Sequence, residues 1–252
     1  MHLAETTWTD LGRDGNAGDR ADIDVALLPV GSTEQHGPHA PLGTDTLAAE
    51  AVTARGAAAY DGEVVVAPAI PVGVSEEHRH FAGTLWVSPD TFRAYVRETV
   101  ESLATHGWDR VVVVNGHGGN VDALREVCAR LTRDGTAYAV PFTWFEAVES
   151  SLEMGHAGAM ETSLLFATRP ELVREGCLED AAADGATRWG EWEAGVNLAY
   201  DSAAFAGNGV VGDPREADEQ QGKDLLDDAG ARLAELVAVV AAREWGSEQR
   251  ET

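Results

Sequence analysis

The chain has 252 residues, of which 44% are hydrophobic, so it is long enough for one large domain with a sizeable core. Its 43 acidic and 18 basic residues give a net charge of -25, which repels the phosphates of nucleic acids and anionic membranes and excludes both as partners. The acidic residues are scattered along the chain, which favours an adaptation to a salt-rich cytoplasm over a binding patch for a cationic partner.

The first ten residues, Met1 to Asp10, lack the basic cluster and apolar run of a signal peptide. No stretch of the chain approaches the ~20 apolar residues of a membrane span. We therefore expect a soluble cytoplasmic protein. Because no repeat or linker divides the sequence, we expect a single domain over residues 1–252.

From residue 25 onward, short apolar runs alternate with helical segments, and residues 175–210 are less regular. Ser88 and Pro89 open one helix as its N-cap and first turn, and Gly107 ends it. This alternation predicts an α/β fold with a mostly parallel β-sheet flanked by helices. The predicted strands are 25–30, 63–70, 110–114 and 137–141, and the predicted helices are about 45–60, 88–106, 121–133 and 214–243.

Unusual polar residues follow each predicted strand, at the edge of the sheet where α/β proteins form their sites. The first strand is followed by Gly31-Ser-Thr-Glu-Gln-His-Gly and then Asp45, and the second by Glu77-His78. The third is followed by Asn115-Gly-His-Gly-Gly-Asn, and His156-Ala-Gly-Ala-Met-Glu-Thr-Ser lies beyond the fourth. Of the 8 histidines, those at this rim are His36, His78, His117 and His156.

Carboxylates and imidazoles gathered at one rim would repel one another and lose hydration unless a cation neutralised them. Divalent metal ions solve that problem, and mixed ligation by His, Asp and Glu suits Zn²⁺, Mn²⁺ or Fe²⁺. An aspartate shared between two ions is a natural way to hold a pair of metals. The candidate ligands are Glu34, His36, Asp45, His117 and Glu161.

Each motif also has a simpler interpretation. Asp45 alone would suit a helix N-cap, and His156 with Glu161 could be a helix start with its first-turn carboxylate. The turn Gly116–Asn120 could bind a phosphate at a helix N-terminus, as in a non-catalytic nucleotide binder. That alternative leaves the cluster of Glu34, His36 and Asp45 unexplained.

Together these motifs, with Phe81-Ala-Gly-Thr and Gly209-Val-Val-Gly-Asp-Pro, resemble the creatininase family of amidohydrolases over about residues 20–240. The resemblance implies a three-layer α/β sandwich, two divalent metal ions per subunit and a homohexamer assembled from dimers. Zn²⁺ is the first choice of metal, with Mn²⁺ or Fe²⁺ as alternatives.

Carried over by position, the resemblance gives each motif residue a role. Glu34, Asp45 and His117 would bind one metal. His36 and the bridging Asp45 would bind the second together with Glu161. The catalytic residues would be His156 and Glu161. Trp144 would cover the substrate, and Glu77 and His78 would contact it.

Two departures from creatinine-cleaving members argue against creatinine as the substrate. Those enzymes have a metal-binding glutamate where this chain has Gly119, and a substrate-binding tryptophan where it has Leu152. The resemblance implies hydrolysis of a C–N amide bond in a cyclic amide, a formamide on a pyrimidine nucleotide, or a short modified peptide. The Gly-His-Gly-Gly-Asn form is typical of the peptidases of the mycofactocin system, which favours the peptide, and the acidic surface disfavours the nucleotide.

Overall fold

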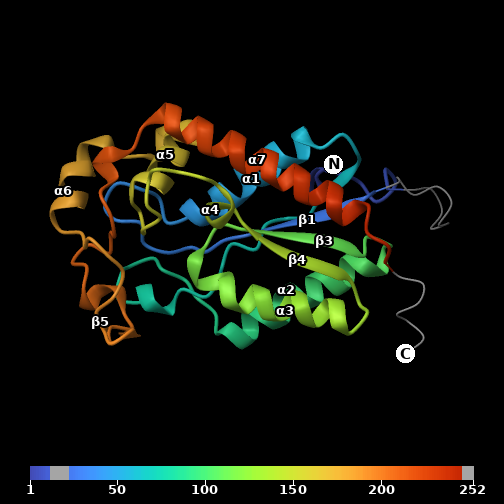
Figure 1. The fold of residues 1–252 in the computed structure, drawn as a ribbon, viewed down its shortest axis with the longest axis horizontal. Helices are drawn as coiled ribbons and strands as arrows, with labels where there is room; N and C mark the ends of the chain where they lie inside the picture. Colours follow the sequence, from blue (N-terminus) through green and yellow to red (C-terminus); the bar gives the residue numbers. More distant parts are fainter. Residues whose placement is uncertain (12–22, 246–252) are drawn as a thin grey trace.

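A sheet of four parallel strands, in the order β2-β1-β3-β4, forms the centre of the molecule (Figure 1). The computed structural model describes residues 1–11 and 23–245. The two central strands are buried on both faces, which explains why they read as continuous apolar runs in the sequence. The strands are β1 (Val25–Val30), β2 (Val64–Val66), β3 (Arg110–Asn115) and β4 (Tyr138–Thr143).

Helices cover both faces of this sheet, which gives three layers (Figure 1). Successive residues of β3 point to opposite faces, so Val111 and Val113 pack against one layer while Val112 and Val114 pack against the other. The fold is therefore the predicted α/β sandwich. One layer holds α2 (Pro89–Thr105) and α3 (Val121–Arg133), and the other holds α1 (Thr44–Ala59), α5 (Ala159–Thr168) and α7 (Glu219–Ala241).

Shorter elements lie beyond the sheet, most of them in the part of the sequence that showed no regular pattern. They include α4 (Trp144–Ala147), α6 (Leu178–Ala183) and a small hairpin of β5 (Trp192–Glu193) and β6 (Val196–Asn197). In Figure 1, α6 and β5 lie together at the left end of the molecule. None of the helices formed by the described residues has the length and apolarity that a membrane crossing requires.

Capping residues set the helix boundaries. Ser88 accepts a hydrogen bond from the Thr91 amide at 3.2 Å and opens α2 as predicted. The last helix starts later than predicted, because Asp218 is extended and caps it by accepting from the Gln221 amide at 3.0 Å. Pro214–Glu216 instead forms a separate 3-10 turn.

Two prolines explain the differences in strand length. The predicted strand 63–70 is regular only over Val64–Val66, because Pro68 has no amide hydrogen to continue the ladder. Pairing returns as an isolated bridge between Ile70 and Val30. β4 runs past Pro141 because it is an edge strand, where proline is tolerated.

Candidate metal centre

Five of the predicted site residues reach one buried point from three parts of the chain. Glu34 and His36 follow β1, and Asp45 lies in the first turn of α1. His117 lies between β3 and the 3-10 turn Gly118–Asn120, and Glu161 lies in the first turn of α5. All five side chains are almost completely buried.

These residues form two overlapping groups that could each hold a metal ion. In the first group, His117 Nδ1 lies 3.2 Å from Glu34 Oε1 and 3.2 Å from Asp45 Oδ2. In the second, His36 Nε2 lies 3.1 Å from Asp45 Oδ1 and 3.8 Å from Glu161 Oε1. The ligand atoms within each group lie within 4.8 Å of one another, and Asp45 belongs to both groups.

Both histidines turn one ring nitrogen toward these carboxylates and bind the backbone through the other. His117 Nε2 donates to the Val74 carbonyl at 2.7 Å, which leaves Nδ1 to face Glu34 and Asp45. His36 Nδ1 lies 3.2 Å from the Glu34 carbonyl, where it donates, and this leaves Nε2 to face Asp45. Such an outer hydrogen bond to a backbone carbonyl is how metal-binding histidines are normally oriented.

Several buried polar atoms in the cluster have no hydrogen-bond partner. Buried polar groups are nearly always satisfied, so this concentration requires a partner that is not a protein side chain. A divalent cation would satisfy carboxylate oxygens and an imidazole lone pair together, so the donor set fits a metal. The atoms are both carboxylate oxygens of Glu34, Nε2 of His36 and Oδ2 of Asp45.

The electrostatics of the metal-free cluster show the same need for positive charge. Burial raises the pKa of Glu34 to about 7. Burial disfavours the charged form of His36 and His117, but the neighbouring carboxylates outweigh it and hold both pKa values well above 6.5. Burial alone would raise the pKa of Asp45, but the positive charges on His36 and His117 outweigh burial and lower it. Without metal, the cluster holds extra protons in place of cations.

A close approach of backbone segments makes this cluster possible. A side chain at Gly116 would place its Cβ 2.1 Å from the carbonyl oxygen of Asp45, so only glycine lets α1 start so near β3. Asn115 holds the next turn by donating to the His117 carbonyl at 2.8 Å and accepting from its amide at 3.1 Å. Asn120 ties that turn to β1 by donating to the Gly31 carbonyl at 3.0 Å.

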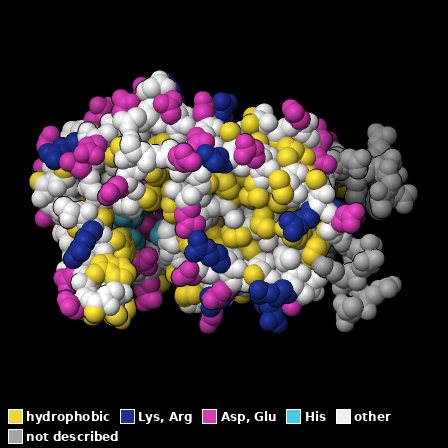
Figure 2. All heavy atoms as spheres, viewed as in Figure 1, with side chains coloured by type: hydrophobic (Ala, Val, Ile, Leu, Met, Phe, Trp, Pro, Cys, Tyr) yellow, Lys and Arg dark blue, Asp and Glu magenta, His cyan; other side chains and the backbone are white. Residues whose placement is uncertain are grey.

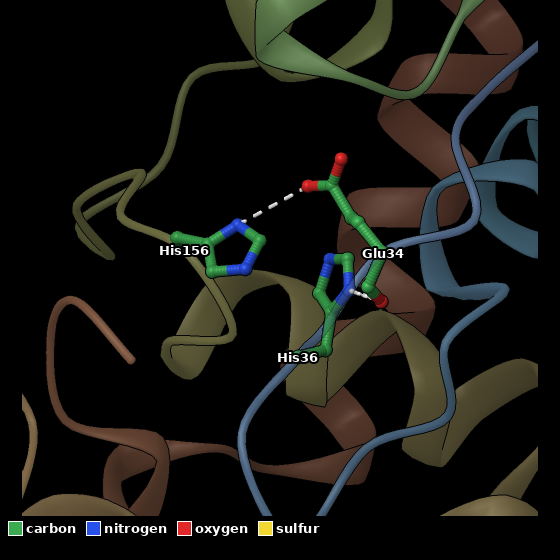
Figure 3. Close-up of side chains that lie close together, drawn as sticks. All are labelled: Glu34, His36 and His156. Carbon is green, nitrogen blue, oxygen red and sulfur yellow. Dashed lines mark hydrogen bonds and ion pairs between the residues drawn. The ribbon is translucent and has the colours of Figure 1, made fainter. Parts of the chain in front are cut away.

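His156 lies beside the cluster and forms a third possible ligand group with Glu34 and His36, which Figure 3 shows. It sits before α5 in an isolated bridge with Val211, so it occupies the loop while Glu161 occupies the helix, as predicted. Its Nε2 donates to the Gln35 carbonyl at 2.6 Å, and its Nδ1 lies 3.6 Å from Glu34 Oε1. Burial, together with the nearby charge on His36, lowers the pKa of His156 to about 4 and keeps the ring neutral.

His78 stacks on His156 with ring centroids 4.3 Å apart. Gln35 Nε2 donates to its Nδ1 at 2.8 Å, so His78 Nε2 carries the hydrogen and points toward Glu34 Oε1 at 3.5 Å. Burial and the neighbouring histidines lower the pKa of His78. Gln35 therefore orients both His78 and His156, a role that the sequence did not suggest although the residue lies within the motif.

A cavity of about 480 Å³ opens onto this cluster. Figure 2 shows histidine and acidic side chains at the bottom of a hollow on one face of the molecule. The cavity wall includes Glu77, His78, His117, His156 and Glu161, together with Phe145 and Trp189.

Trp144 does not lie in the cavity, although the resemblance placed it over the substrate. It is the first residue of α4, is fully buried and packs in the core between the sheet and α7. The next residue, Phe145, lines the cavity instead. Trp189 provides a second aromatic wall. Its ring centroid lies 5.5 Å from that of His78 and 6.1 Å from that of His156, both in edge-on arrangements. It belongs to the irregular region 175–210, where no periodic pattern pointed to it.

Comparisons with known proteins point to one family. The family model described as "Creatininase: Creatinine amidohydrolase" matches residues 4–237. A mycofactocin precursor peptide peptidase of Mycobacterium ulcerans is 37% identical over 219 residues, which covers 82% of this chain and 84% of that protein. A creatinine amidohydrolase of Pseudomonas putida is 31% identical, covering 69% of this chain and 74% of that protein.

The fold agrees as well. A solved structure described as "Creatininase Mn" superposes with a TM-score of 0.77 at 25% identity, covering 96% of this chain and 99% of that one. Sequence and fold together identify a hydrolase that acts on amide bonds. The chain belongs to the creatininase family.

Proposed function

We propose that the chain hydrolyses a C–N amide bond in a short peptide or small amide at a centre of two divalent metal ions. The observation that supports this most is the position of Asp45, whose two oxygens face two different histidines at 3.1 and 3.2 Å. Glu34 and His117 would complete the ligands of one ion, and His36 and Glu161 those of the other.

Zn²⁺ is our first choice of metal, with Mn²⁺ or Fe²⁺ as alternatives, because the donors are nitrogen and carboxylate oxygen. The related structure described as "Creatininase Mn" supports manganese as one alternative. When bound, the two ions supply the Lewis acidity that activates water at neutral pH and polarises a carbonyl oxygen.

His156 has the geometry of a proton carrier. Its Nε2 hydrogen is held by the Gln35 carbonyl, so the free lone pair of the neutral ring is on Nδ1. Nδ1 lies 3.6 Å from Glu34 Oε1, and the residue lines the cavity, so His156 would stand between the cluster and a bound substrate. Nδ1 would accept a proton from the attacking water and give it to the amide nitrogen as the C–N bond breaks.

A short peptide is the substrate that we favour. The similar protein of M. ulcerans is named for cleaving a precursor peptide. The cavity of about 480 Å³ is within the range that holds drug-sized ligands, and Phe145 and Trp189 give it aromatic walls. Glu77 and His78, which line the same cavity, are the polar groups available to orient the peptide.

The test is hydrolysis of a panel of short peptides by zinc-loaded protein, with product masses measured by mass spectrometry and creatinine as a comparison substrate. We expect cleavage of at least one peptide, loss of that activity with a chelator, and recovery when zinc is restored. Cleavage that survives complete metal removal would contradict the proposal. If the protein hydrolyses creatinine but none of the peptides, the proposed substrate becomes a cyclic amide instead of a peptide.

A further inference from the structure

One cationic residue belongs to the wall of the cavity that leads to the candidate metal cluster. Among the described residues that form its wall, Arg188 is the one arginine or lysine, whereas carboxylates are contributed by Glu77, Glu153 and Glu161. Arg188 is exposed and belongs to the cavity wall beside Trp189.

Arg188 has no ion pair among the residues that the structure describes, although the protein has 43 acidic residues. Arg215, by contrast, pairs with Asp213 at 2.7 Å and with Glu179 at 3.2 Å. Neither Glu153 nor Glu77, which share the cavity wall, pairs with Arg188. Its guanidinium therefore remains available to a ligand.

The backbone on both sides of Arg188 is fixed. The Ala186 amide donates to the Val210 carbonyl at 2.8 Å, and the Ala186 carbonyl accepts from the Gly212 amide at 2.9 Å. Trp189 packs against Phe205 with ring centroids 5.2 Å apart, and its carbonyl accepts from the indole of Trp192 at 2.7 Å. Because the backbone is already held, binding a partner at Arg188 would not require the surrounding loop to become ordered.

We propose that Arg188 determines substrate specificity by binding a carboxylate of the substrate, an inference that rests on the proposed amide hydrolysis. The planar guanidinium donates two parallel hydrogen bonds to a carboxylate, which gives both strength and orientation. Without Arg188, the acidic wall would repel an anionic substrate. The carboxylate could be the C-terminus of a peptide or the side chain of an acidic residue within it.

Four peptides separate these two sources. The probe is an acetylated alanine tetrapeptide whose third residue is either aspartate or asparagine, each prepared with a C-terminal acid or a C-terminal amide. Binding to zinc-loaded protein is measured by calorimetry in the His156→Ala background, which slows turnover, with and without Arg188→Gln. Arg133→Gln is the matched control, because Arg133 also lacks an ion pair among the described residues and does not line the cavity.

We expect Arg188→Gln to weaken binding of the peptides that carry the recognised carboxylate by about tenfold or more, in line with a charge-assisted hydrogen bond. The matching neutral peptides should bind equally to both proteins, and Arg133→Gln should change nothing. If only the peptides with a C-terminal acid lose affinity, Arg188 binds the C-terminal carboxylate. If only the peptides with aspartate lose affinity, it binds the side-chain carboxylate.

If Arg188→Gln weakens binding of all four peptides equally, or of none, the role of Arg188 in binding a carboxylate is overturned. The same holds if none of the peptides binds. Failure of the proposed function gives a different result. In that case the carboxylate peptides would still bind in an Arg188-dependent manner, while the zinc-loaded protein with His156 intact would cleave none of them.

Discussion

The metal-free protein should lose stability as the pH rises from 7 to 8. His36 and His117 keep a second proton in the folded state, because nearby carboxylates outweigh burial and hold their pKa values well above 6.5. In the unfolded chain both rings are neutral above pH 6.5. The folded state then binds more protons than the unfolded state, so the free energy of unfolding falls with rising pH.

The size of the fall follows from the number of protons. Each proton held only by the folded state lowers the free energy of unfolding by about 1.4 kcal/mol per pH unit. Two histidines therefore give roughly 2–3 kcal/mol per pH unit, a large share of the roughly 5–15 kcal/mol that stabilises a typical domain. Glu34, whose pKa is raised to about 7, adds a smaller fall of the same sign near pH 7. His156, whose pKa is lowered to about 4, is neutral in both states above pH 6.5 and adds nothing.

Bound metal should remove or reverse this dependence, because the ions replace the protons and bind more tightly as the ligands deprotonate. Urea unfolding at pH 7.0, 7.5 and 8.0, with chelator or with zinc, measures both cases. His117→Asn removes one of the two rings, so it should roughly halve the slope of the metal-free protein. A metal-free protein whose stability stays constant or rises between pH 7 and 8 would refute the charge assignment.

Three further predictions concern the site and the surface. His156→Ala should keep its metal but lose roughly 10²-fold in turnover, whereas Glu161→Gln should lower metal affinity. The opposite pattern in metal analysis would mean that the two roles are exchanged. Gly116→Ala should lower the free energy of unfolding, measured in urea, by about 1–3 kcal/mol and weaken metal binding, because its Cβ would meet the Asp45 carbonyl oxygen at 2.1 Å. An unchanged unfolding transition would contradict this packing. If the charge of -25 is an adaptation to salt, the melting temperature should rise steeply from dilute buffer to molar salt, and a salt-independent value would favour a cationic partner.

The fold was predictable because its strongest signals are local. The run of four valines in β3 and the Ser88-Pro89 start of α2 each determine an element without reference to the rest of the chain. Boundaries that depend on one competing residue were less predictable. Pro68 shortened β2, and Asp218 moved the start of α7 from residue 214 to 219.

The gathering of candidate ligands was predictable where side chains follow strands, because parallel strands bring their carboxyl ends to one edge. Glu34, His36 and His117 fall in this class. Trp144 and Phe145 show the limit, since adjacent residues on a single turn of α4 face the core and the cavity respectively. Arg188 and Trp189 come from an irregular segment, and only their tertiary contacts show that they belong to the cavity wall.

The metal content of the purified protein tests the central claim most directly. By elemental analysis, the zinc-loaded protein should hold two ions per chain. Asp45→Ala should hold far less than one, because Asp45 belongs to both ligand groups. Asp122→Asn, which removes an exposed carboxylate from α3, should keep both ions and serves as the matched control. Near-normal metal content in Asp45→Ala, or a single ion in the unmodified protein, would contradict a centre of two metals bridged by this residue.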